Sequence, residues 1–439
     1  MTTESRNSGT SGNERNSLTM ADKFLIQGGV PLSGEVEISG YKNSAGAILA
    51  AVLLSEKPSI IDNLPLATDV SDQIEMLKQM GAGIEWLGEK KIKINPANIS
   101  PEKIPADLFE KMRLSVLLVG PLLARFKKFK IPHPGGDKIG LRPILTHIQA
   151  LKDFGVKVEE KEGFYHFEAP ENLEGKQIIL KEFSVSATEI LMMAASSAKG
   201  KTRIELTAAE PQVQDLGIML QKMGVNIEGI GTHAITIEGR NDLNGAEFSI
   251  CPDPLEVGTF LIAFAVTGGN GKINNVNPEH LISFLDKMKE IGVNFEVSGN
   301  TISVRPSNLG FRATKIQVLP YPGFPTDLQP QISVLLTQAQ GRSLIHDPLY
   351  ENRFQYLHEL RKMGADIEIT DPHRALIFGK TELIGNKISA LDIRAGASLI
   401  LAGLCAKGET QIEDVSQIER GYEKFDEKLR NLGAKIKKV

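Results

Sequence analysis

The chain repeats one short phrase six times, and the first copy is LKQMGAGIEW at residues 77–86. The copies recur at intervals of about 70 residues, a period typical of repeat architectures. In each copy an amphipathic pattern ends at a glycine, and alternating apolar residues follow. Because glycine has no Cβ, it readily ends a helix in the left-handed conformation. The phrase therefore predicts a helix, a glycine cap and a strand in every unit. The other copies are LKDFGVKVEE (151–160), LQKMGVNIEG (220–229), MKEIGVNFEV (288–297), LRKMGADIEI (360–369) and LRNLGAKIKK (429–438).

Each unit also carries a segment rich in small apolar residues, followed by a β-rich segment. Segments that are apolar nearly all round predict buried helices, and at about 10–15 residues they are too short to span a membrane. A whole unit then reads β-α-β-α-β-β. The predicted buried helices are 43–55, 113–126, 186–200, 256–269, 327–341 and 394–408. The β-rich segments are 58–64, 128–134, 201–207, 271–277, 342–348 and 409–415.

The ends of the chain indicate how the units are grouped. The first strand, KFLIQGG (23–29), precedes the first helix, and the last unit stops after a single strand. The simplest arrangement has the N-terminal strand completing the C-terminal domain. We therefore expect an α/β protein with a C-terminal domain of 21–41 plus 252–439 and an inserted N-terminal domain of 42–251. A cleft between two such domains is the default place for a site.

Composition limits the classes of function. Hydrophobic residues make up 41% and charged residues 24% of the 439 residues, and the net charge is −4. This charge argues against nucleic-acid binding and membrane-surface binding, and no apolar run of 18 residues occurs. Cys251 and Cys405 lie in apolar runs, so we expect no disulfide framework and a cytoplasmic location. Residues 1–20 are almost purely polar and are expected to be disordered.

The starts of the buried helices carry an unusual set of charged and polar residues. A helix N-terminus has partial positive charge and unpaired N–H groups, so it attracts anions, whereas a cation there is unfavourable for the helix itself. Three of the six units nevertheless place Lys or Arg at this point, which favours a functional role over a solvated charge at a frayed end. The residues at these starts are Lys42–Asn43, Arg113, Ser184–Ser186, Glu256, Thr326–Asp327 and Arg394.

A second set of charges lies in the loops before five of the six amphipathic helices: Asp69, Asp137 with Arg142, Glu210, Arg353 and Arg420. The loop RFKKFKIPHPGGDKIGLRP (125–143) is long, basic and rich in glycine and proline. Such a loop is typical of a mobile lid over an anionic substrate, and we assign residues 130–143 to it. An exposed basic loop without function is the alternative.

Common cofactor and metal motifs are absent from the sequence. There is no GxxxxGK[ST] loop, no GxGxxG after a strand, no HExxH and no CxxC, and the eight histidines show no metal-ligand spacing. We therefore expect no metal and no organic cofactor.

Five strings resemble the enolpyruvyl transferases, in particular those that act on UDP-N-acetylglucosamine. EPSP synthase shares that family's fold but not these strings. In this family six β-α-β-α-β-β units form a two-domain inverse α/β barrel. The resemblance covers nearly the whole chain from about residue 22. The strings are SGYKNSAG (39–46), PGFPTDLQ (322–329), YENRF (350–354), DIRAGAS (392–398) and IERGYEKFDEKLRNLGA (418–434).

The resemblance implies transfer of the enolpyruvyl group of phosphoenolpyruvate to the 3-hydroxyl of UDP-N-acetylglucosamine, with release of phosphate. This is the committed step of peptidoglycan synthesis, and it implies no obligatory protein partner. By the same resemblance, Lys42, Arg142 and Arg420 hold phosphoenolpyruvate, and Arg113 and Arg394 line the same cleft. The aminosugar contacts Asn43, Asp327 and Leu349, and the uridine diphosphate lies near Arg142, Pro143, Ile144, Ser184 and Val185. Asp327 is the expected base for the sugar hydroxyl.

Asp137 is the chief departure from the family pattern. Most members carry in this loop a cysteine that is implicated as general acid and is alkylated by fosfomycin. An Asp donates a proton if its pKa is raised, but it is a poor target for epoxide alkylation. We therefore expect activity together with intrinsic fosfomycin resistance.

Other departures leave alternatives open. Leu145 and Glu182 replace an Asp and a Lys expected near the uracil and the diphosphate, and Pro254 and Thr68 also replace charged groups. The alternatives are a transferase with a different nucleotide-sugar acceptor and a non-catalytic regulatory paralogue. Retention of Lys42, Asp327, Arg394 and Arg420 argues against the second.

Overall fold

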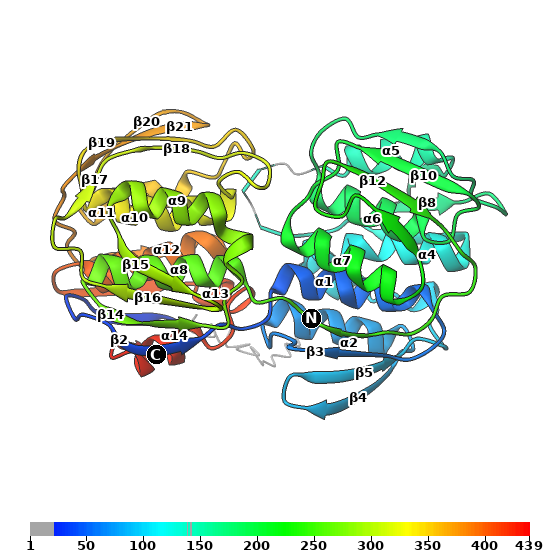
Figure 1. The fold of residues 1–439 in the computed structure, drawn as a ribbon, viewed down its shortest axis with the longest axis horizontal. Coiled ribbons are helices and arrows are strands. Elements are labelled where there is room, and N and C mark those ends of the chain that lie inside the picture. Colours follow the sequence, from blue (N-terminus) through cyan, green and yellow to red (C-terminus); the bar gives the residue numbers. More distant parts are fainter. Residues whose placement is uncertain (1–21, 138, 141–142) are drawn as a thin grey trace, which may run out of the picture.

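The computed structural model describes residues 22–137, 139–140 and 143–439. It is a mixed α/β protein in which two globules lie side by side (Figure 1). Three sheets use only strands from residues 24–37 and 270–438, and three use only strands from residues 59–249. We call the first globule the C-terminal lobe (22–38 and 254–439) and the second the N-terminal lobe (42–250).

In the C-terminal lobe the first strand lies between the last two. β1 is antiparallel to both β23 and β24, with Phe24 opposite Ile412 and Lys438. The first sheet has the order β22 (Lys387–Ser389), β23 (Glu409–Glu413), β1 (Phe24–Gln27) and β24 (Lys435–Lys438). The second is β15 (Asn294–Ser298), β16 (Thr301–Arg305), β14 (Asn270–Asn274) and β2 (Ser33–Glu37). The third is β17 (Phe311–Arg312), β19 (Ala339–His346), β21 (Arg374–Gly379) and β20 (Asp366–Asp371), with β18 (Lys315–Gln317) also paired to β19.

The N-terminal lobe repeats this plan with strands that alternate buried apolar and exposed polar residues. In β5, for example, Ile92 and Ile94 are fully buried beside lysines that face outward. Its first sheet has the order β13 (Glu247–Ser249), β3 (Ser59–Asp62), β5 (Lys91–Asn95) and β4 (Gly83–Gly88). The second has the order β11 (Asn226–Glu228), β12 (Ala234–Glu238), β10 (Lys201–Glu205) and β9 (Gln177–Ile179). The third has the order β6 (Lys128–Pro132), β8 (Phe164–Glu168) and β7 (Lys157–Lys161).

The helices rich in small residues form the cores of the lobes, as the sequence predicts. In the C-terminal lobe three of them pack on one another: α8 (Pro254–Thr267), α10 (Gln329–Thr337) and α12 (Ile393–Cys405). In the N-terminal lobe the corresponding segments are α1 (Lys42–Ala51) with the 3-10 helix η1 (Val52–Leu54), η3 (Arg113–Leu118) with α4 (Val119–Phe126), and α6 (Val185–Ala195).

Amphipathic helices cover these cores and end at the repeated glycines. Gly81, Gly155, Gly224, Gly292, Gly364 and Gly433 all have φ between 93° and 112°, so the predicted left-handed caps are confirmed. The amphipathic helices are α2 (Thr68–Gln79), α5 (Leu145–Phe154), α7 (Pro211–Lys222), α9 (Ile282–Ile291), α11 (Gln355–Lys362) and α14 (Phe425–Asn431). Shorter elements are α3 (Ala106–Lys111), α13 (Ser416–Glu419), η2 (Pro101–Lys103), η4 (Pro278–Leu281) and η5 (Thr326–Leu328).

Some predicted buried helices differ from the observed ones in helix type or in where they end; the helix predicted at 186–200, for example, ends at Ala195. The segment 113–126 is a 3-10 helix followed by an α-helix. Pro121 has no N–H to donate to the carbonyl of Leu117, which removes one α-helical hydrogen bond from this stretch. The helix predicted at 327–341 starts as a 3-10 turn and ends at Thr337, because residues from Ala339 onward pair with β17 and β21 instead.

The chain crosses between the lobes twice, and the two crossings pair with each other. The N–H of Tyr41 donates to the carbonyl of Cys251 (2.8 Å), and the N–H of Asp253 donates to the carbonyl of Ser39 (2.9 Å). We call residues 39–41 and 251–253 the hinge ladder. No helix in the described ranges is both long and apolar enough to cross a membrane.

Candidate active site between the lobes

The start of α1 places a buried lysine at the lobe boundary. Nζ of Lys42 donates to Oδ2 of Asp69 over 2.8 Å, and Asp69 lies in the first turn of α2. The other oxygen of Asp69 accepts from Nε of Arg420, a residue of the C-terminal lobe, over 3.0 Å. Burial raises the pKa of Asp69, but the charges of Lys42 and Arg420 outweigh this and leave the pKa lowered. Asp69 is therefore an ionised carboxylate between two cations from different lobes.

A second carboxylate lies between two arginines on the C-terminal side. Asp327, in η5, accepts from Nη2 of Arg353 (2.7 Å) and from Nε of Arg394 (3.2 Å). Burial raises the pKa of Asp327, but the charges of Arg394 and then Arg353 lower it to about 2. Asp392 caps α12 by accepting the N–H groups of Arg394 and Ala395, and so fixes Arg394 in the first turn.

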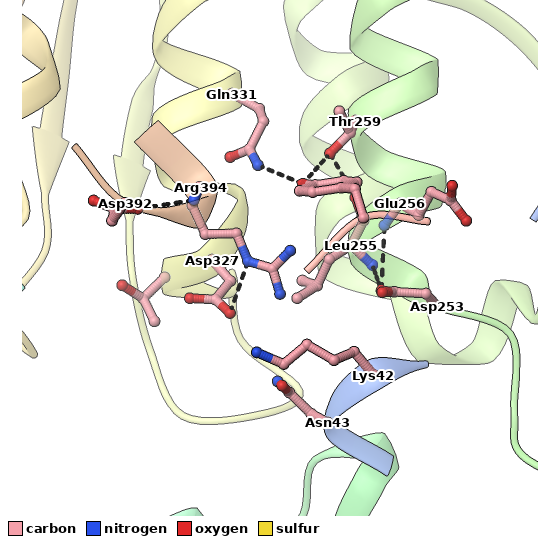
Figure 2. A network of polar contacts seen from close by, with 12 residues as sticks. Lys42, Asn43, Asp253, Leu255, Glu256, Thr259, Asp327, Gln331, Asp392 and Arg394 are labelled. Atoms are coloured by element: carbon pink, nitrogen blue, oxygen red, sulfur yellow. Dashed lines mark hydrogen bonds and ion pairs between the residues drawn. The ribbon is translucent and has the colours of Figure 1, made fainter. Parts of the chain in front are cut away.

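Figure 2 shows the part of the site at which Lys42 faces Asp327 and Arg394 across the boundary. Lys42 and Asn43 project from the start of α1 toward Asp327 and Arg394 (Figure 2). Arg394 is only 4% exposed, and among the described residues its Nη1 has no hydrogen-bond partner. A buried guanidinium with an unpaired nitrogen is costly unless an anion completes it. The arrangement therefore fits an anionic ligand.

The loop that carries Asp137 contacts the C-terminal lobe. Oδ1 of Asp137 accepts from Nη1 of Arg420 over 2.6 Å, and the carbonyl of Ile139 accepts from the N–H of Asn352 over 3.1 Å. A cavity of about 390 Å³ lies beneath this loop. It is lined by Arg113, His133, Pro134, Gly135, Gly136, Asp137, Gly140, Pro143, Ile144, Tyr165 and Asn352. Arg142, which the sequence also predicts as a site residue, lies outside the described residues.

The residues predicted near the nucleotide form a separate group in the N-terminal lobe. Oγ of Ser184 caps α6 by accepting the N–H of Ala187 over 3.3 Å, so Val185 is the first helical residue. The starts of α5 and α6 adjoin, since Nε2 of His147 lies 2.7 Å from Oγ of Ser186. Burial and then the charge of Arg113 lower the pKa of His147 to about 3, so this imidazole is neutral. 

Two departures from the family pattern lie at the same place. Oγ1 of Thr146 donates to the carboxylate of Glu182 over 2.5 Å, and Leu145 is 68% exposed. Leu349, predicted near the sugar, is 44% exposed. Its N–H donates to Asp347, which also accepts from Thr326 beside Asp327.

From the sequence alone, two residues of this site receive no site role. Asp69 and Arg353 are identified there only as charged residues, yet each pairs directly with a predicted site residue, Lys42 and Asp327 respectively. The repeat held the signal that could have found them. Asp69 lies in the first turn of the amphipathic helix α2, and Arg353 lies just before α11. Both therefore follow the β-rich segment of their units, as Asp137 and Arg420 do in theirs.

Comparison with known proteins gives the family. The family model described as EPSP synthase (3-phosphoshikimate 1-carboxyvinyltransferase) matches residues 26–429. The UDP-N-acetylglucosamine 1-carboxyvinyltransferase of Halothermothrix orenii is 44% identical over 95% of this chain and 99% of that protein. The protein of the same name from Helicobacter pylori is 42% identical over 95% of this chain and 99% of its own length.

Solved structures share the fold. The enolpyruvyl transferase NikO from Streptomyces tendae superposes with a TM-score of 0.87 at 24% identity, covering 96% of this chain and 99% of that one. EPSP synthase from Acinetobacter baumannii gives a TM-score of 0.72 at 18% identity, covering 95% of this chain and 100% of that one. The chain therefore belongs to the enolpyruvyl transferase family, as an enzyme whose relatives at 42–44% identity are UDP-N-acetylglucosamine 1-carboxyvinyltransferases.

Proposed function

We propose that this enzyme transfers the enolpyruvyl group of phosphoenolpyruvate to the 3-hydroxyl of UDP-N-acetylglucosamine and releases phosphate. The observation that carries the proposal is the buried guanidinium of Arg394, which faces Lys42 across the lobe boundary (Figure 2) and has one nitrogen without a hydrogen-bond partner in the part of the chain that the structure describes. The names of the 42–44% identical relatives support the acceptor.

The negative charge of phosphoenolpyruvate explains why the proposed site contains lysine and arginine side chains. Phosphoenolpyruvate carries about three negative charges, and charge-assisted hydrogen bonds from Arg and Lys bind such groups strongly. Lys42 and Arg420 already hold a carboxylate, Asp69, at 2.8 and 3.0 Å, so their side chains are set at ion-pair distance. In our proposal phosphoenolpyruvate is bound by Lys42, Arg420, Arg394, Arg113 and Arg142, and these cations also stabilise the departing phosphate.

Asp327 is the proposed base. It takes the proton of the sugar 3-hydroxyl as that oxygen attacks C2 of phosphoenolpyruvate. With both arginines bound, a pKa of about 2 makes it a weak base. When Arg394 turns to the substrate, Asp327 loses one of its two cations and its pKa rises. Base strength is thereby coupled to occupancy of the phosphoenolpyruvate site.

Asp137 is the proposed proton donor to C3, the vinyl carbon of phosphoenolpyruvate. Loss of a proton from the same carbon then accompanies departure of phosphate, so the addition and the elimination balance. As the loop stands, Oδ1 of Asp137 accepts from Nη1 of Arg420 over 2.6 Å. Phosphoenolpyruvate would have to take over Arg420 before the side chain of Asp137 can turn to the vinyl carbon.

The nucleotide sugar is assigned to the remaining residues. Asn43 and Leu349 contact the aminosugar, and Pro143, Ile144, Ser184 and Val185 lie along the uridine diphosphate. The N-terminus of α6 suits a phosphate group because its first N–H groups are unpaired within the helix. The buried neutral His147 beside Ser186 adds a polar group without adding charge.

The finer description of the fold belongs to the same proposal. We infer a two-domain inverse α/β barrel of six β-α-β-α-β-β units, divided as 21–41 plus 252–439 and 42–251. The six positive-φ glycines and the separation of strands between two sets of sheets support it. The proposed context is cytoplasmic peptidoglycan synthesis.

A second candidate, a transferase for another nucleotide sugar, is favoured by one observation. The carboxylate of Glu182 is held by Thr146 at the place where the family pattern has a lysine. A negative charge there would repel a diphosphate that lies close to it.

Phosphate release tests both candidates. The enzyme is mixed with phosphoenolpyruvate, with and without UDP-N-acetylglucosamine, and phosphate is measured. Release that requires the sugar nucleotide supports the first candidate. No release with this acceptor, but release with another nucleotide sugar, would overturn it in favour of the second. If no nucleotide sugar supports release, both fail and the non-catalytic alternative gains.

A further inference from the structure

The hinge ladder is held at its two ends by one buried carboxylate from each lobe. From the C-terminal lobe, Oε2 of Glu256 in α8 accepts the backbone N–H of Ser39 over 2.8 Å. From the N-terminal lobe, Oδ2 of Asp215 in α7 accepts the backbone N–H of Cys251 over 3.0 Å. Both acids are buried, at 2% and 7% exposure.

Each carboxylate is itself fixed by a second partner in its own lobe. Oε1 of Glu256 pairs with Nζ of Lys428 over 2.7 Å, and the same Nζ donates to Oγ of Ser39 over 2.8 Å. Oδ2 of Asp215 also accepts from Oγ of Ser44 over 2.5 Å. We call each of these two carboxylates, together with its two donors, a grip. In both grips one buried acid accepts hydrogen bonds from a backbone N–H of the hinge ladder and from a side-chain donor.

The grips lie within a few residues of the proposed site. Ser39 precedes Lys42 by three positions, and Glu256 lies in the first turn of the helix that Asp253 caps. In Figure 2 the carboxylate of Glu256 is directed away from Arg394, so it does not join the charges at the site. Its route to the site is through the backbone, from Ser39 to Lys42.

We propose that Glu256 and Asp215 are positioning residues that set where Lys42 stands relative to Asp327 and Arg394. Gripping the ladder at both ends leaves only Gly40 and Pro252 between the fixed points. The ladder then transmits the orientation of one lobe to the first turn of α1 in the other. The part of this inference that concerns turnover rests on the function proposed above, whereas the part that concerns the ladder does not.

The chain offers a matched control for Glu256. Glu359 is also a buried glutamate, at 7% exposure, and it accepts a backbone N–H, that of Ser389, over 3.2 Å. It also pairs with Nζ of Lys362 over 2.8 Å. Glu359 therefore has the same donor set as Glu256, but it lies within one lobe and away from the ladder.

Hydrogen exchange on the full chain tests the grip without any substrate. In Glu256→Gln and Asp215→Asn, the amides of Tyr41 and Asp253 should exchange about tenfold faster than in the unmodified protein, because the ladder opens more often. Glu359→Gln should leave these amides unchanged. Unchanged exchange of both amides in both grip variants would overturn the proposal.

Steady-state kinetics tests the positioning role. Since small misplacements of reacting groups cost large factors in rate, we expect kcat to fall on the order of 10- to 100-fold in Glu256→Gln, with little change in KM for UDP-N-acetylglucosamine. Glu359→Gln, at a matched melting temperature, should keep its kcat. Equal kcat values in the two variants would overturn the positioning role even if the ladder exchanges faster. If the unmodified protein releases no phosphate, the proposed function fails and the exchange result still decides the grip.

Discussion

Arg420 of the C-terminal lobe donates through Nε to Oδ1 of Asp69 of the N-terminal lobe, over 3.0 Å. Asp69 is almost fully buried, and its other oxygen holds Lys42. Breaking a buried ion pair by removing one partner is costly because it leaves an uncompensated charge. Under the function proposed above, the carboxylate of Asp69 supplies to Lys42 and Arg420 the negative charge that phosphoenolpyruvate would supply during turnover.

We predict that Asp69→Asn destabilises the substrate-free enzyme by about 3 kcal/mol and makes it respond more strongly to anions. Without the carboxylate, Lys42 and Arg420 repel each other until an anion binds. Thermal unfolding with and without phosphoenolpyruvate measures both effects, and the rise in Tm on binding should exceed that of the unmodified enzyme.

Asp62→Asn is the control for this prediction. Asp62 also pairs with a lysine, Lys91, at 3.4 Å in the same lobe, but the pair is half exposed. Such pairs contribute about 1 kcal/mol or less. Equal ligand-induced shifts in the two variants would show that Asp69 does not stand in for substrate charge.

Asp327→Asn should lower kcat by about 100-fold or more, because the amide cannot accept the sugar proton. The amide keeps the size of the carboxylate, so we expect KM for phosphoenolpyruvate to change much less than kcat. Phosphate release measures both. Asp371→Asn, which breaks an exposed pair with Arg374 in the same lobe, is the control. An Asp327→Asn enzyme with unaltered kcat would remove Asp327 from the role of base.

We expect the unmodified enzyme to resist fosfomycin, and Asp137→Cys should make it subject to time-dependent inactivation by fosfomycin. A thiolate opens the epoxide, whereas a carboxylate at this place is a poor nucleophile. The two native thiols do not compete: burial raises the pKa of Cys405 to about 12, and burial also raises the pKa of Cys251, followed by the charge of Asp215. Mass spectrometry of the inactivated variant should locate one adduct on residue 137. An adduct on Asp137 of the unmodified enzyme would contradict the prediction.

His147 should make the folded protein less stable as the pH falls below about 6.5. Its pKa is lowered to about 3 in the folded state by burial and then by Arg113. Between these pH values the unfolded chain binds a proton at His147 that the folded protein does not bind. The contribution of His147 to the free energy of unfolding is therefore fully present above about pH 6.5 and decreases as the pH falls toward 3. At pH 5 the loss is about 2 kcal/mol. Urea unfolding of the protein and of His147→Gln at pH 7 and 5 measures it, and the variant should lose less stability. Parallel losses in both proteins would refute this assignment.

Much of the fold could be predicted from the sequence because its signals are local. The glycine after each amphipathic helix predicts a cap by its own stereochemistry, and all six adopt it. Helix ends that depend on pairing with strands elsewhere in the sequence could not be predicted as well. The segment after Thr337 pairs with β17 and β21, which lie far from it in the sequence, and no local pattern reveals that.

The site was predicted as a set of residues but not as a set of pairs. The helix starts point to Lys42 and Arg394 individually. Arg420 pairs with both Asp69 and Asp137, and Asp69 also pairs with Lys42. The two pairs made by Arg420 depend on how the two lobes meet. Pairing across a boundary between lobes is set by the tertiary arrangement, whereas the charge at a helix start is set by the sequence around it.

The position of β1 between β23 and β24 has a consequence for how the protein is made. A ribosome that has passed residue 249 has completed all strands of the three sheets in the N-terminal lobe, so this lobe can fold while synthesis continues. Phe24 of β1 has both of its partner strands only when Ile412 and Lys438 have emerged. β1 must therefore wait for these two strands while the whole N-terminal lobe is made, and long-range pairing of this kind is slow to form. The C-terminal lobe, which contains β1, is therefore the lobe that finishes folding last.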